Sequence, residues 1–205
     1  LQGLVSNDVA KLNVGEGCYA AFLNVHGRIE ADVHIFRFED GLVLHTPPEA
    51  ADSLEKNLGR FRLAGGFDLE RLGERHAMIA VLGPDSRDLL ARLTGLDAPE
   101  RLRCGESNSP GASLKLLGVP RCQTDSVDVL GGADAVAAIR QSLREAGALP
   151  AGTEALEIAR LEAGIARFGR DFDNDTVLQE VDCPEIVSFQ KGCYLGQEIV
   201  ARLHF

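Results

Sequence analysis

The sequence predicts an α+β protein in which helices pack on antiparallel sheets. Residues 28–35 alternate strictly, with apolar side chains at the odd positions and polar ones at the even positions. This period of two is typical of a half-buried strand. The chain also repeats groups of two strands followed by a helix, which favours α+β over a doubly wound parallel sheet.

The first third of the chain predicts a hairpin, a third strand and a helix. An apolar run over 18–25 ends in the turn residues 24–27, so it pairs with the strand at 28–35. The alternation breaks at residues 36–38, which indicates a bulge. A strand at 42–46 follows, then a helix from the proline pair at 47–48 to about residue 63, and a further strand at 67–72.

The pattern restarts at residue 77, so we expect a boundary near residue 75. The elements expected beyond it are a strand at 78–82, a helix to residue 93, a polar loop at 98–110, strands at 114–119 and 127–130, and a helix at 134–146. The predicted divisions are therefore 1–75, 76–150 and 151–205.

Composition excludes several classes of function. The 205 residues carry a net charge of −10, which argues against direct nucleic-acid binding. No apolar run approaches the roughly 20 residues that span a bilayer, so no membrane segment is expected. The five cysteines are widely spaced without a C-x-x-C pair, which suits a reducing compartment, and the histidines show no metal spacing. We therefore assign no metal. Both ends stop in mid-pattern, and we expect a longer protein.

The residues at 191–198, KGCYLGQE, place one thiol between two glycines. Apolar residues then recur at helical spacing, so Cys193 is expected just ahead of a helix N-terminus, next to Lys191. A helix N-terminus and a lysine both favour thiolate over thiol. The alternative is that Cys193 is a small buried hydrophobic residue.

This segment, with the Ala-Arg at 201–202, resembles the signature of the YgfZ/IBA57 family. Those folate-binding proteins maintain iron–sulfur clusters and are related to the glycine-cleavage T-protein, an aminomethyltransferase. The resemblance implies a T-protein-like fold with a tetrahydrofolate pocket between interlocked subdomains. It also implies that residues 151–205 return to the first subdomain, and that a C-terminal β-barrel domain is absent from this chain.

The resemblance further implies a role in making or repairing [4Fe–4S] clusters. Its partners would be iron–sulfur assembly or client proteins, with indirect effects on cluster enzymes such as tRNA methylthiolases. The compartment would be the bacterial cytoplasm or the mitochondrial matrix. Cys193 would be the reactive thiol, tuned by Lys191.

Glu162 is the first candidate for the folate. On a helix expected over 154–166 it falls inside the apolar stripe, with Arg160 on the other side. A carboxylate there needs donors, either from a structural partner or from a flat ligand such as a pterin. Residues 160–164 (RLEAG) resemble the folate-contacting helix of the T-protein family, which implies that Glu162 binds the pterin.

Asp32 is the second candidate. Its strand alone predicts a solvated side chain. However, residues 23–32 resemble the T-protein segment that carries an acidic pair near the folate. Here Ala31 replaces the first acid, which weakens the case for aminomethyl transfer while a folate pocket survives. Asn24 and Arg28 flank the turn and are either turn-forming residues or polar contacts to the ligand.

Gln197 and Arg202 complete the candidate folate contacts. For Arg202 the alternative is a local ion pair with Glu198, one helical turn away.

Two other functions stay open. One is a true enzyme, an aminomethyltransferase or related demethylase. The other is a scaffold that keeps the fold and binds only proteins. Whether the chain is an enzyme is left undecided, with an accessory role favoured.

Overall fold

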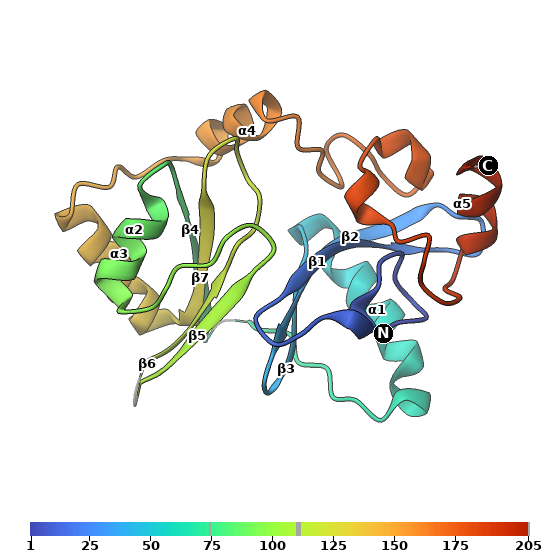
Figure 1. Cartoon of the computed structure of the whole chain (residues 1–205), viewed down its shortest axis with the longest axis horizontal. Coiled ribbons are helices and arrows are strands. Elements are labelled where there is room, and N and C mark those ends of the chain that lie inside the picture. Colours follow the sequence, from blue (N-terminus) through green and yellow to red (C-terminus); the bar gives the residue numbers. More distant parts are fainter. Residues whose placement is uncertain (74, 110–111, 205) are drawn as a thin grey trace. The chain divides into compact units, whose positions relative to one another are not determined.

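The computed structural model describes residues 1–73, 75–109 and 112–204, and it divides into two compact units (Figure 1). The first unit contains Leu1–Arg71 and Ala166–Phe205, and the second contains Leu72–Ile165. In this division the chain returns to the first unit at Ala166, and residues 151–165 belong to the second unit. Each unit has its own sheet and its own hydrophobic core.

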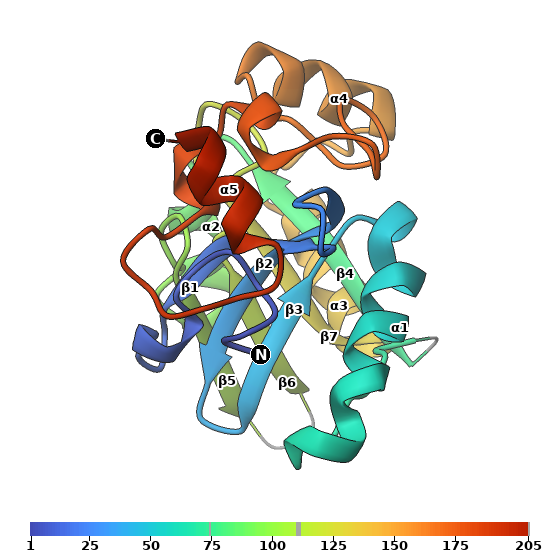
Figure 2. The ribbon, with the colours of Figure 1, turned by 90° about the vertical axis from the view of Figure 1, so that its right-hand side faces the viewer.

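The first unit is built on an antiparallel sheet in the order β1-β2-β3. Its strands are β1 (Gly17–Leu23), β2 (Ile29–Phe38) and β3 (Gly41–His45), and α1 (Pro48–Gly65) packs against β2 (Figure 2). The alternation in β2 is confirmed, since Ile29, Ala31, Val33 and Ile35 are fully buried. The bulge is at Phe22/Leu23 of β1 and not at residues 36–38.

The strand predicted at 67–72 is wrong, because these residues form no regular secondary structure. The segment instead runs back along α1. The Arg71 guanidinium lies 2.7 Å from Asp52 and 3.2 Å from Glu55, and Leu69 packs against the first core. Contacts to a helix therefore replace the pairing that a strand would need.

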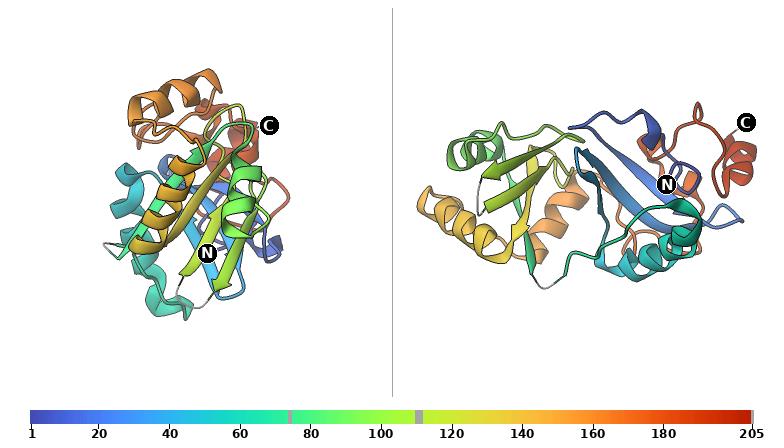
Figure 3. Two further views of the ribbon diagram at one scale, coloured as in Figure 1. Left: turned by 90° about the vertical axis from the view of Figure 1, so that its left-hand side faces the viewer. Right: turned by 90° about the horizontal axis from the view of Figure 1, so that it is seen from below.

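The second unit has a four-stranded antiparallel sheet in the order β4-β7-β6-β5. Its elements are β4 (His76–Leu82), α2 (Ser86–Thr94), β5 (Cys104–Ser109), β6 (Ala112–Leu117), β7 (Ser126–Gly132), α3 (Ala133–Glu145) and α4 (Thr153–Glu162). The helices α2 and α3 lie together over this sheet (Figure 3, left). The prediction of an α+β fold with antiparallel sheets is confirmed.

The loop predicted over 98–110 is wrong from residue 104 onward. There β5 pairs with β6 in a continuous antiparallel register from Cys104↔Leu117 to Ser109↔Ala112. Because β5 is an edge strand of this sheet, its backbone is paired on one side only and its side chains can be small and polar. Pro110, the last residue of the predicted loop, lies outside the described residues.

The C-terminal part of the first unit is mostly irregular. It contains two short 3₁₀ helices, Leu178–Val181 and Pro184–Ile186, and ends in α5 (Gln197–His204). A third short 3₁₀ helix covers Val9–Lys11 near the N-terminus. In the described part of the chain, no helix is long and apolar enough to cross a membrane.

Candidate functional site

Asp32 is buried in the first unit with only one of its carboxylate oxygens occupied. The residue is 4% exposed, and the Tyr19 hydroxyl donates a hydrogen bond of 2.7 Å to its Oδ2. Its Oδ1 is also buried and has no hydrogen-bond partner among the described residues. A buried acceptor without a donor costs free energy, so a ligand that donates a hydrogen bond to this oxygen would remove that cost.

Strand pairing explains how the two side chains meet. Ala21 of β1 lies opposite Asp32 of β2, and Tyr19 lies opposite His34. Tyr19 and Asp32 are therefore diagonal neighbours on one face of the sheet, a distance that an aromatic side chain can bridge. The Tyr19 ring also stacks on His34, with centroids 4.4 Å apart.

Burial raises the pKa of Asp32 above its ordinary value. The Tyr19 hydrogen bond, the Phe168 backbone and the charge of Arg167 all favour the carboxylate and oppose this shift. The pKa of Tyr19 is raised too, mainly by burial and then by the neighbouring Asp32. The phenol therefore stays protonated as the donor of the pair. The polar even-numbered face of β2 is thus covered at Asp32, contrary to the solvated side chain that the strand alone predicts.

A stability measurement tests this environment. An acid with a raised folded-state pKa keeps a proton that the unfolded chain has released, so its contribution to stability is lost as pH rises through that window. Asparagine carries no charge to bury. We expect Asp32→Asn to be more stable than the wild type, by a margin that grows from pH 4 to pH 8, in urea unfolding followed by tyrosine emission. Glu198→Gln, which alters an exposed side chain, should keep the wild-type profile, and parallel profiles for Asp32→Asn would contradict the expectation.

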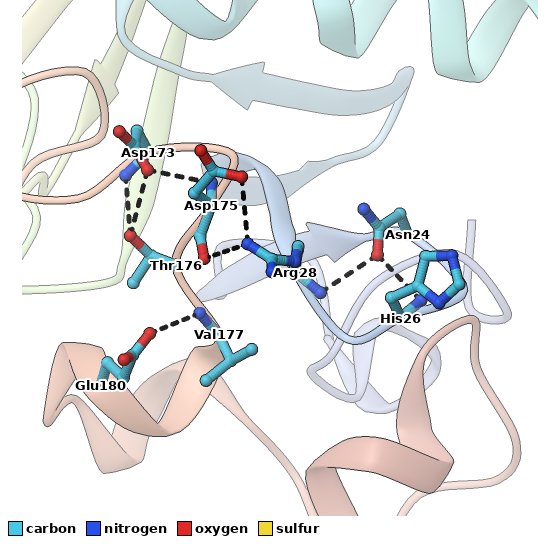
Figure 4. Close-up of polar contacts among 8 residues, drawn as sticks. All are labelled: Asn24, His26, Arg28, Asp173, Asp175, Thr176, Val177 and Glu180. Carbon is cyan, nitrogen blue, oxygen red and sulfur yellow. Dashed lines mark hydrogen bonds and ion pairs between the residues drawn. The ribbon is translucent and has the colours of Figure 1, made fainter.

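Asn24 and Arg28 order the tip of the hairpin (Figure 4). The Asn24 Oδ1 accepts hydrogen bonds from the backbone N–H of His26 and of Arg28, at 2.9 Å and 3.1 Å. The Arg28 Nη1 donates to the Asp175 carbonyl at 2.5 Å and to its Oδ1 at 3.0 Å. Both side chains thus serve the turn and its contact with the 173–180 segment, which supports the turn-forming alternative.

The 173–180 segment that receives Arg28 is organised by its own acidic side chains. Asp173 accepts a hydrogen bond from the backbone N–H of Asp175, and Glu180 accepts one from that of Val177 (Figure 4). The Ile29 N–H donates to the Thr176 carbonyl, which joins the segment to the start of β2. Among the described residues, no three of His, Cys, Asp and Glu form a group that could hold a metal ion.

The Lys191 side chain is directed at the N-terminal segment and not at Cys193, two residues further along the chain. Its ammonium donates to the carbonyls of Gln2, Val5 and Asn7 at 2.6, 2.6 and 2.7 Å, and it lies 5.0 Å from the centre of the Tyr194 ring. Burial lowers the pKa of Lys191. All three N–H donors of the ammonium are therefore spent on the N-terminal segment, so the structure gives this lysine a tethering role.

Cys193 is exposed, and the helix expected directly after it begins only at Gln197. Gly196 rather than Gly192 has the positive φ, +81°. A Cβ at Gly196 would lie 2.6 Å from the Asn24 carbonyl oxygen, so this glycine allows α5 to approach the hairpin tip. The prediction that the helix N-terminus lies at the thiol is wrong by one helical turn. The alternative of a buried cysteine is also wrong.

The two remaining candidates on α5 have local partners. The Gln197 Oε1 accepts a hydrogen bond of 3.1 Å from the Tyr194 backbone, and Arg202 pairs with Glu198 at 2.8 Å. The local ion pair, the alternative given above for Arg202, is therefore the geometry observed.

Glu162 is exposed, and it is the last residue of α4, not a position inside an apolar stripe. The helix ends there, four residues before the predicted end at residue 166, because Gly164 adopts a positive φ of +67°. The buried residue of this helix is Arg160, 7% exposed, which donates to the Ile165 carbonyl at 2.7 Å and to Glu157 at 2.8 Å. Of the candidate residues, Glu162 alone belongs to the second unit.

Comparison with known proteins identifies the class. The model of the GCVT N-terminal domain matches residues 1–191, so the chain belongs to this family. It is 30% identical over 203 residues to an aminomethyltransferase from Thermus thermophilus, covering 97% of this chain and 57% of that protein. It is 26% identical over 211 residues to the aminomethyltransferase of Koribacter versatilis, covering 96% of this chain and 54% of the relative.

The structure of the chain is also similar to that of an aminomethyltransferase. Aminomethyltransferase T of the glycine cleavage system from Bartonella henselae superposes with a TM-score of 0.80 at 20% identity, covering all of this chain and 57% of that one. The chain thus spans a little over half the length of the relatives it matches. A T-protein-like fold is shown.

Tyr19 is a site residue that was not predicted from the sequence. It lies opposite His34, two residues from Asp32 on the paired strand, and this place in the predicted hairpin was the signal that could have identified it.

Proposed function

We propose that this chain binds tetrahydrofolate, with Asp32 as a ligand to the pterin ring. One observation carries the proposal: the Asp32 Oδ1 is buried and lacks a hydrogen-bond donor among the described residues. A pterin presents ring N–H and amino groups along one edge, which are the donors that such an oxygen needs. The residue type and the vacant acceptor therefore fit this cofactor.

Glu162, which belongs to the second unit, is a separate candidate for a folate contact, because residues 160–164 resemble the folate-contacting helix of the T-protein family. Its side chain is exposed, so a ligand in solvent can reach the carboxylate. Asn24, Arg28, Gln197 and Arg202 are less suited, because local partners already occupy them. When bound, tetrahydrofolate carries one-carbon units on a ring nitrogen and on the neighbouring linker nitrogen, and Asp32 would bind and orient the pterin ring.

The use of the folate would be the assembly or repair of [4Fe–4S] clusters, with iron–sulfur assembly or client proteins as partners. The support is the KGCYLGQE segment and the exposure of its thiol, which a partner protein could reach. In this role the protein would act in the bacterial cytoplasm or the mitochondrial matrix. The Cys193 thiol would work separately from the folate site.

The second candidate is folate-dependent aminomethyl transfer. The relatives named aminomethyltransferase favour it. Against it stands Ala31, which replaces the first acid of the pair expected near the folate. Formation of a one-carbon folate from an aminomethyl donor would select this function, whereas a folate-binding chain without transfer would select the accessory role.

Calorimetric titration with tetrahydrofolate tests the proposal. We expect Asp32→Asn and Glu162→Gln each to weaken binding by about 1.5–3 kcal/mol, or roughly 10- to 150-fold, the worth of a hydrogen bond to a charged group. Cys193→Ala should bind as the wild type does. Glu198→Gln is the matched control, an exposed acid paired only locally. No binding by the wild type, or equal affinity in Asp32→Asn, refutes the assignment.

A further inference from the structure

We infer that Tyr19 is a positioning residue, whose hydroxyl holds one oxygen of Asp32 so that the other is presented to the ligand. The inference rests on the proposed function, since it assigns to Tyr19 the positioning of the Asp32 carboxylate for the folate. It starts from one contact, the 2.7 Å hydrogen bond from the Tyr19 hydroxyl to the Asp32 Oδ2.

The Tyr19 ring is itself held in place. Tyr19 is 7% exposed, and its ring stacks on His34 at an interplanar angle of 22°. The position of its hydroxyl is therefore fixed by packing, and it in turn fixes the rotation of the carboxylate. A site built this way is ordered before a ligand arrives, which saves the ligand the cost of ordering it.

The arrangement also limits what Asp32 can bind. With Oδ2 engaged, Oδ1 is the carboxylate oxygen that lacks a donor among the described residues. Asp32 is thus set to accept a hydrogen bond from an N–H group through one oxygen, and not to form the two parallel bonds of a free carboxylate. While Asp32 is ionised, ligands that present an acceptor to Oδ1 would be rejected.

Several other ionisable groups surround the pair. Arg167 favours the Asp32 carboxylate, whereas Cys183 and Glu185 act on Tyr19. The His34 ring stacks on the Tyr19 ring, and the centre of the His45 ring lies 6.0 Å from that of His34. The experiment therefore follows Asp32 itself by ¹³C-carboxyl NMR.

Tyr19→Phe removes only the hydroxyl. Because that hydrogen bond favours the charged carboxylate, we expect the titration of Asp32 in the free protein to move to higher pH. Tetrahydrofolate affinity should fall about 5- to 20-fold at pH 7, and its decline toward acid pH should begin at higher pH than in the wild type. Tyr194→Phe, which removes the hydroxyl of the only other tyrosine, should change neither.

The outcomes separate the two proposals. If the wild type binds no tetrahydrofolate, the proposed function fails, and the Asp32 titration alone then decides whether Tyr19 sets that carboxylate. If the wild type binds and Asp32→Asn does not, an unchanged affinity and titration in Tyr19→Phe overturn the role of Tyr19. Should Tyr19→Phe not fold, 3-fluorotyrosine in the Tyr194→Phe background makes Tyr19 a stronger donor, and the Asp32 titration must move to lower pH for the inference to stand.

Discussion

Replacing Asp128 by asparagine is expected to lower the free energy of unfolding of the second unit by about 3–5 kcal/mol, the cost of breaking a buried ion pair. Asp128 lies on β7 and is fully buried. The Arg121 Nε donates to its Oδ1 at 2.8 Å and the Nη2 to its Oδ2 at 2.6 Å. Asparagine keeps the shape but leaves the guanidinium without the charge that compensates its burial.

Hydrogen exchange of the β7 amides is the appropriate measurement, because both tyrosines lie in the first unit and the chain has no tryptophan. Amides that exchange through unfolding of the unit should exchange about 100-fold faster or more. Glu198→Gln, which breaks an exposed ion pair, should leave them unchanged. The double change Arg121→Met with Asp128→Leu should recover much of the protection. Slow β7 exchange in Asp128→Asn would show that the pair is not a major source of stability.

Short-range patterns were sufficient for most of the fold. The period of two in β2 identified its buried face because every odd side chain from 29 to 35 enters one core. The helix after Pro47 also follows local rules, with proline at its start and Gly66 at a left-handed φ of +58° at its end.

The errors arise where non-local contacts override composition. The β5 sequence CGESNS is polar, yet its backbone pairs with β6, and that partner is invisible in a local window. Residues 67–72 show the opposite error. Their composition is typical of a strand, yet they form no strand, and their side chains contact α1 and the first core.

For the candidate site too, local chemistry was predicted correctly and the effects of non-local contacts were not. The chemistry of Asp32 was recognised, but its burial was not, because residues near Phe168 cover a strand that lies more than a hundred positions earlier. On α4 the helical stripe was assigned from apolar residues. The structure instead buries Arg160, which pairs with the half-buried Glu157, and leaves Ile158 and Leu161 exposed. An arginine that donates to a backbone carbonyl and pairs with a carboxylate, as Arg160 does, can occupy a buried position that periodicity reserves for apolar side chains.

Replacing Lys191 by methionine is the second change expected to have a large effect. Methionine keeps most of the length of the side chain but removes the ammonium that binds the carbonyls of Gln2, Val5 and Asn7. Hydrogen bonds to a charged group contribute about 1.5–3 kcal/mol each and are not additive, so we expect the first unit to lose about 3 kcal/mol in urea unfolding followed by tyrosine emission. The N-terminal segment, residues 1–8, should become sensitive to protease.

The same variant decides what Lys191 does for the thiol. If the lysine activated Cys193, its removal would slow alkylation of that residue and move the reaction to higher pH. The geometry predicts no such change, because the ammonium is committed to three backbone carbonyls and Cys193 is already exposed.

Peptide mapping after brief alkylation distinguishes Cys193 from the buried Cys18, whose pKa burial raises to about 11. Lys11→Met, which removes an exposed lysine near the same segment, is the matched control. A slower Cys193 reaction at unchanged stability would reverse the assignment and make Lys191 an activating residue, whereas lower stability at an unchanged rate would identify it as the tether between the N-terminus and the KGCYLGQE segment.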